Sequence, residues 1–66
     1  MTPEQMKIDA AEAIHSGTNI TYVRHRSAKP PPKFPRGKLL CENFDGTCVY
    51  SYDPVRVLAW FIENEQ

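Results

Sequence analysis

With 66 residues, 41% of them apolar and seven aromatic (three Phe, three Tyr, one Trp), the chain forms a single small domain, residues 1–66, and general disorder is excluded. A core this thin leaves little room for a catalytic pocket with supporting side chains, so we predict a protein that is not an enzyme. The formal net charge is zero, yet six of the eight basic residues lie between positions 24 and 38 and every acidic residue lies outside that window.

The sequence predicts a cytoplasmic protein that does not contact a membrane. Its longest apolar run, Val57 to Ile62, is far shorter than the ~20 residues that span a bilayer. The opening Met-Thr-Pro-Glu-Gln lacks the basic and apolar regions of a signal peptide. In such a compartment Cys41 and Cys48 are expected to be reduced thiols.

The first predicted element is a helix in the segment TPEQMKIDAAEAIHSG, residues 2–17. Thr2 and Gln5 have the spacing of a capping box, and Pro3 suits the first helical position. Gly17 suits a left-handed stop. The apolar face that we expect to point inward consists of Met6, Ala10, Ala13 and Ile14.

Three strands are predicted next, at 19–26, 38–42 and 47–52, of which the first, NITYVRHR, is rich in β-branched and aromatic residues. The last two are joined by NFDG, which favours a type I turn followed by a left-handed residue and a bulge at Gly46. With that bulge, Glu42 pairs with Cys48 and Cys41 with Val49, so the cysteines point to opposite faces and form no disulfide. We expect Cys41 to be the buried one.

The final predicted element is a helix in DPVRVLAWFIENEQ, residues 53–66, opened by the cap Asp53 and by Pro54. Its inward face is predicted to consist of Val55, Leu58, Phe61 and Ile62. The fold class is therefore α+β, in the order α-β-β-β-α, with two helices packed on one face of a three-stranded antiparallel sheet. The predicted apolar core is Met6, Ala10, Ile14, Ile20, Leu39, Cys41, Val49, Leu58, Phe61 and Ile62.

The stretch HRSAKPPPKFPRGK, residues 25–38, is the most distinctive feature; we call it the basic arm, and its proline-rich connection covers about 27–37. Its prolines favour an extended left-handed conformation, and its charges suit a phosphate backbone or an acidic protein groove. Phe34, Tyr22 and His25 offer rings for stacking on bases. The predicted binding residues in and beside the arm are Arg24, Arg26, Lys29, Lys33, Phe34, Arg36 and Lys38. The alternative is a solvated connector whose prolines cap a sheet edge.

A second predicted surface involves Trp60, which lies on the helix face of Arg56 rather than that of Leu58. Ile8 is similarly placed on a polar face of the first helix. Ile8, Arg56 and Trp60 are therefore the candidate interface of a protein–protein inhibitor or a homodimer. The alternative is that the basic arm covers Trp60.

Metal binding and catalysis have little support in the sequence. His15, His25, Cys41 and Cys48 include none of the close ligand pairs of structural zinc sites, and three scattered glycines build no phosphate loop. We expect no cofactor and no catalytic residue.

The stretches FPRGKLL and YSYDPVRVLAW, in a chain this short with cap-proline helices, resemble the small orphan accessory proteins encoded by tailed phages. The resemblance implies a protein that binds nucleic acid or a host protein and modulates that host factor. It assigns a role to no residue.

Overall fold

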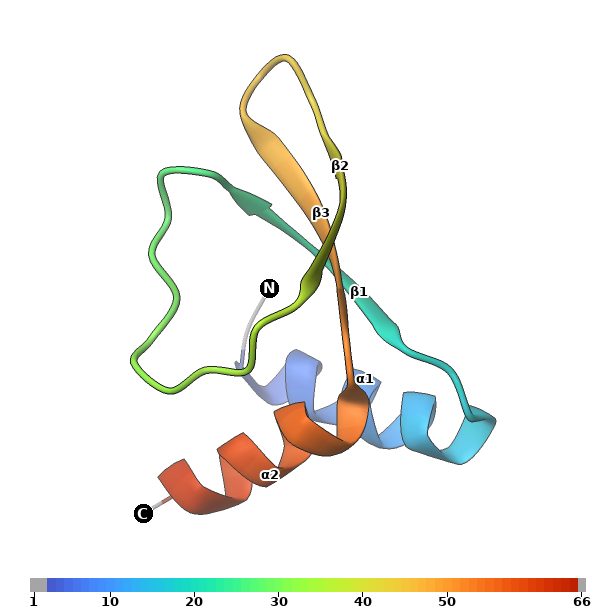
Figure 1. The fold of residues 1–66 in the computed structure, drawn as a ribbon. Helices are drawn as coiled ribbons and strands as arrows, with labels where there is room; N and C mark the ends of the chain where they lie inside the picture. The colour runs from blue at the N-terminus through green and yellow to red at the C-terminus, as the bar shows by residue number, and fades with distance from the viewer. Residues whose placement is uncertain (1–2, 66) are drawn as a thin grey trace.

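The computed structural model describes residues 3–65 and has the predicted order of elements (Figure 1). They are α1 (Pro3–Ser16), β1 (Ile20–His25), β2 (Lys38–Glu42), β3 (Thr47–Tyr52) and α2 (Pro54–Asn64). The strands form an antiparallel sheet in the order β1-β3-β2, which confirms the α+β class. Neither helix within residues 3–65 has the length and apolar character that crossing a membrane requires.

Local signals in the sequence set the helix ends. Asp53 caps α2, because its side chain accepts a hydrogen bond from the Val55 N–H at 3.0 Å, and Pro54 occupies the first turn. At the end of α1, Gly17 has a φ of 71°, and the following Thr18 N–H donates to the Ala13 carbonyl at 3.0 Å. The predicted cap Thr2 lies outside the described residues.

The β2–β3 hairpin has the predicted register. Cys41 pairs with Val49 and Glu42 with Cys48, and the turn closes with Gly46 at a φ of 86°. An added Cβ at Gly46 would lie 2.6 Å from the His25 Nε2, so both the backbone angle and the space favour glycine here. The register shifts again between Leu39 and Cys41, an irregularity that the sequence did not predict.

The core lies between the helices and the end of the sheet where β1 begins and β3 ends (Figure 1). Tyr22 ties the sheet to α1, because its hydroxyl donates to the Met6 carbonyl at 2.9 Å. Cys48 is buried at 3% exposure on the same sheet face, which we call the inner face. The buried cluster consists of Ala10, Ala13, Ile20, Tyr22, Tyr52, Val57 and Phe61.

Two sheet residues predicted to lie in the core, Leu39 and Cys41, are exposed. The hairpin runs away from the helices, so nothing covers β2, whose five residues are all exposed (Figure 1). The hairpin register also places Cys41 beside Val49, on the face opposite Cys48, and Val49 is only half-buried. The prediction that Cys41 is the buried cysteine is therefore wrong, and Cys48 takes that place.

The helix faces also differ from the prediction. α2 buries Pro54, Val57 and Phe61, with Leu58 half-buried, whereas Val55 and Ile62 are exposed. This segment is apolar almost all round, so several stripes were compatible with its sequence. In α1 the small residues Ala10 and Ala13 are buried, Met6 is half-buried and Ile14 is exposed, because close packing uses a narrow stripe.

Candidate functional site

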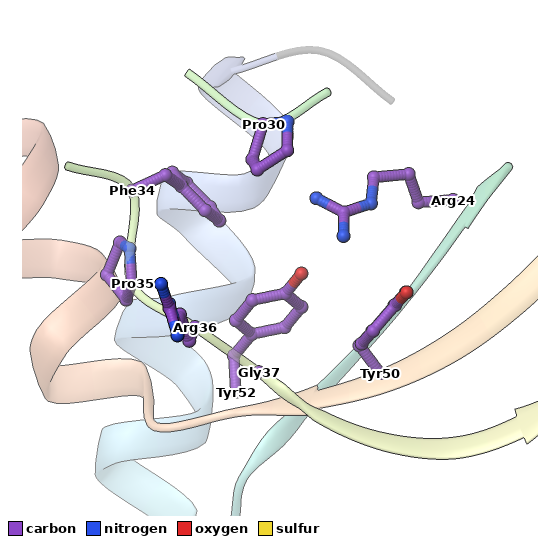
Figure 2. Close-up of a pocket in the computed structure, with 8 residues that line it drawn as sticks. All are labelled: Arg24, Pro30, Phe34, Pro35, Arg36, Gly37, Tyr50 and Tyr52. Atoms are coloured by element: carbon purple, nitrogen blue, oxygen red, sulfur yellow. The ribbon is translucent and has the colours of Figure 1, made fainter. Parts of the chain in front are cut away.

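The basic arm folds back over the inner face of the sheet, and Phe34 anchors it there (Figure 2). The Phe34 ring makes edge-on contacts with Tyr52, at a centroid distance of 5.7 Å, and with Trp60, at 5.1 Å. Trp60 is consequently half-buried, and its indole nitrogen is buried without a hydrogen-bond partner in residues 3–65. The arm therefore covers Trp60, which was the alternative to an interface at this residue.

The start of the arm is tied to the hairpin turn. The Arg26 N–H donates to the Gly46 carbonyl at 2.9 Å. The Ser27 N–H donates to Nδ1 of His25 at 3.3 Å, which leaves the proton on Nε2 to be donated to the Asp45 carbonyl at 3.0 Å. These bonds occupy both ring nitrogens of His25 and hold the ring beside the hairpin turn.

The three prolines do not form one straight rod. The chain turns at Pro32 and Lys33, where Lys33 has a φ of 66° and the Phe34 N–H donates to the Pro31 carbonyl at 3.1 Å. This turn directs Phe34 inward and leaves Lys33 exposed at the bend. The arm therefore presents its charges around a bend rather than along a line.

Most of the arm's cations are free of acidic partners. Within residues 3–65, no carboxylate forms an ion pair with the exposed side chains of Lys29, Lys33, Arg36 or Lys38. Arg26 differs, because its guanidinium contacts the Glu42 carboxylate at 3.1 Å. The exposed charge of the arm is thus concentrated in four side chains.

Arg24 points across the inner face of β1 into the space beneath the arm (Figure 2). Its guanidinium carbon lies 4.7 Å from the centroid of the Tyr50 ring, a cation–π contact. Its Nε is buried and makes no hydrogen bond to any described residue, and no described carboxylate pairs with it. Arg24 is therefore a half-buried cation that packs against the Tyr50 ring and has no carboxylate partner among residues 3–65.

The space beneath the arm is a cleft with two lobes of about 260 Å³ and 320 Å³. The two lobes share four lining residues, which lie between them: Arg24, Pro30, Phe34 and Tyr52. The smaller lobe, drawn in Figure 2, adds Pro35, Arg36, Gly37 and Tyr50. The larger lobe adds Pro3, Met6, Tyr22, Val23, Lys29, Pro31, Trp60 and Phe61.

The electrostatics of the cleft reflect its burial. Desolvation raises the pKa of the Tyr52 hydroxyl, while the nearby positive charge of Arg24 acts in the opposite direction. Burial, assisted by the charge of Asp9, raises the pKa of Tyr22 to about 12. Both phenols are therefore neutral hydrogen-bonding groups at ordinary pH.

The alternative interface residues are dispersed. Ile8, half-exposed on α1, and Arg56, whose guanidinium lies 3.9 Å from the Asp53 carboxylate, remain on the surface of the helices. Trp60 instead forms part of the cleft wall.

Sequence reasoning missed the tyrosines of the cleft. Tyr50 and Tyr52 alternate along β3, and their register with Tyr22 and Ile20 places all four on the inner face. The alternation of residues in CVYSY, 48–52, indicated that the two tyrosines share one face of the strand, but it did not indicate that this face is the inner one. Among residues 3–65, no three His, Cys, Asp or Glu side chains come together as a possible metal site.

Comparison of the chain with models of protein families, with curated proteins and with solved structures found no match.

Proposed function

We propose that the protein is a non-enzymatic binding protein that holds nucleic acid through its basic arm. The observation that carries this proposal is the arm itself, in which four exposed cations lack acidic partners among residues 3–65. Phe34 and the turn at Lys33 fix the shape of the arm, so little conformational entropy is lost on binding.

Nucleic acid fits this surface better than an acidic protein groove, because the cations lie beside an aromatic cleft. Proteins that bind single strands combine a basic track for the phosphates with rings on which bases stack. Lys29 lines the larger lobe, as Trp60 does, and Arg36 lines the smaller lobe, as Tyr50 does. An acidic protein surface would use the charges but would leave the cleft without a role.

A protein–protein inhibitor or homodimer acting through Trp60 has less support. A hot-spot tryptophan is expected to be available to the partner. Trp60 is instead half-buried against Phe34, so only part of its ring is open to a protein partner.

The proposal is tested by titrating labelled single-stranded and duplex oligonucleotides at several salt concentrations. Counterion release predicts that the logarithm of the affinity falls linearly with the logarithm of salt, by about 0.7 per phosphate contacted in a single strand. Lys29→Ser with Lys33→Ser should therefore reduce the slope by about 1.4.

The matched control is Lys7→Ser with Arg56→Ser, which removes the same charge from outside the arm, where Lys7 pairs with Glu65 and Arg56 lies near Asp53. Its salt slope should equal that of the wild type. Absence of oligonucleotide binding at low salt, with binding of polyglutamate retained, would assign the arm to an acidic protein and overturn the proposal.

A further inference from the structure

The cleft holds a cation that the described protein does not neutralise. Arg24 is half-buried, its Nε makes no hydrogen bond within residues 3–65, and its only recorded partner is the face of Tyr50. Removing a charged group from water is costly unless a counter-charge or hydrogen bonds replace the lost hydration. A cation–π contact offsets part of this cost, and an anion in the cleft would offset more.

The two lobes on either side of Arg24 differ in chemistry. The smaller lobe is lined by Arg24 and Arg36 as well as by Tyr50 and Tyr52, and Figure 2 shows the two arginine side chains on opposite sides of the Tyr52 ring. The larger lobe is walled by apolar and aromatic side chains such as Met6, Trp60 and Phe61. A ligand that occupies both must join an oxyanion to a flat apolar group.

We infer that the cleft binds one unpaired nucleotide of a single strand, with its phosphate in the lobe that Arg24 and Arg36 line and its base in the lobe walled by Trp60. This inference rests on the proposed function and deepens it. The guanidinium fork matches phosphate oxygens, and aromatic walls accept any base by stacking. The larger lobe, at about 320 Å³, falls in the range of sites that hold small organic ligands, about 300–1,000 Å³.

The remaining arm cations then serve the neighbouring phosphates of the same strand. Lys29 lines the larger lobe, and Lys33 lies exposed at the bend a few residues beyond it. In a duplex the bases are paired and stacked inside the helix, so none can enter the cleft. Single strands should therefore bind more tightly than duplexes of the same length at equal salt.

The decisive probe is a thymidine decamer compared with an abasic decamer that has the same backbone and lacks the bases. Both have the same phosphates, so a difference in affinity reports the bases. We expect about tenfold tighter binding of the thymidine decamer, which corresponds to about 1.4 kcal/mol and to one stacked base. Trp60 is the chain's single tryptophan and lines the larger lobe, so its fluorescence should change with the thymidine decamer and not with the abasic one.

Arg24→Gln should remove about tenfold of the affinity for both decamers, because both present the phosphate that Arg24 binds. Arg56→Gln is the matched control, because it removes the same group from an arginine that lines neither lobe, and it should leave both affinities unchanged. If Arg24→Gln unfolds the protein, as circular dichroism would reveal, Arg36→Gln replaces it. Arg36 is exposed and lines the same lobe, so its loss should lower both affinities in the same way.

The outcomes separate this inference from the proposed function. Equal affinity for the two decamers, or an unchanged Trp60 emission on tight thymidine binding, would overturn the nucleotide site and leave the arm as a binder of phosphates. Failure of both decamers to bind at low salt would overturn the proposed function as well. A tenfold preference for the thymidine decamer, together with affinities that Arg24→Gln lowers and Arg56→Gln retains, would establish the site.

Discussion

Phe34→Ala should detach the basic arm from the sheet and measurably destabilise the protein. Its ring makes two edge-on contacts, with Tyr52 and Trp60, and each such contact contributes about 0.5–1.5 kcal/mol beyond simple burial. With the burial of a half-exposed ring added, we expect a loss of about 2–3 kcal/mol in the free energy of unfolding. A domain of this length has roughly 3–10 kcal/mol in total, so the effect is large.

Urea denaturation followed by far-ultraviolet circular dichroism measures this loss. The free energy of unfolding of a small domain falls by about 1 kcal/mol per molar urea, so the midpoint of urea unfolding should fall by about 2–3 M. The Trp60 emission of the folded variant should also shift to the red, because the arm no longer shields the indole from water.

Phe44→Ala is the matched control, because Phe44 is fully exposed at the hairpin turn and the same atoms are removed without loss of packing. Its midpoint should stay close to that of the wild type. If Phe34→Ala and Phe44→Ala shift the midpoint equally, or if the Trp60 emission of the first does not move, Phe34 does not anchor the arm and the reasoning is refuted.

Three further predictions follow from the fold. Gly46→Ala should lower the melting temperature more than Gly17→Ala, since both glycines have a positive φ but only at Gly46 would the new Cβ collide with a histidine ring; equal shifts would show that the ring moves aside freely. Tyr22 has its pKa raised from 10.0 to about 12 by burial, so the stability linked to its neutral form should be complete below pH 10 and be lost as the pH rises to about 12. Ultraviolet absorbance titration and alkaline melts would check this, and a Tyr22 that ionises near pH 10 in the folded protein would contradict it. A thiol reagent should modify Cys41 at once and Cys48 only on unfolding, and simultaneous reaction of both thiols would argue against the described hairpin faces.

The features that could be predicted from the sequence are those that neighbouring residues decide among themselves. Asp53 and Pro54 start a helix by satisfying and pre-setting its first turn, and NFDG fixes the hairpin register through one left-handed glycine. These signals act over four or five residues, so no knowledge of the rest of the chain is needed. The α+β class followed directly from them.

Which face of each helix or strand is buried could not be predicted in the same way, because both faces carry apolar residues. On β3, Val49 lies on one face, and Cys48 and its neighbouring tyrosines lie on the other. The pairing of Ile20 with Tyr52 across the sheet determines that the face of the tyrosines is the buried one. The cleft depends on the same tertiary information. Arg24 becomes its central cation only because Phe34, ten residues later, folds back above it.

The strand order has a consequence for how the chain acquires its structure during synthesis. The central strand, β3, is the last of the three to leave the ribosome, and the first strand, β1, pairs with it alone. The hairpin needs only a short loop to close, so it is expected to form before β1 docks across the much longer connection. Until then α1 and β1 have no sheet to pack on, and a nascent chain that ends before Thr47 leaves β1 with no strand to join.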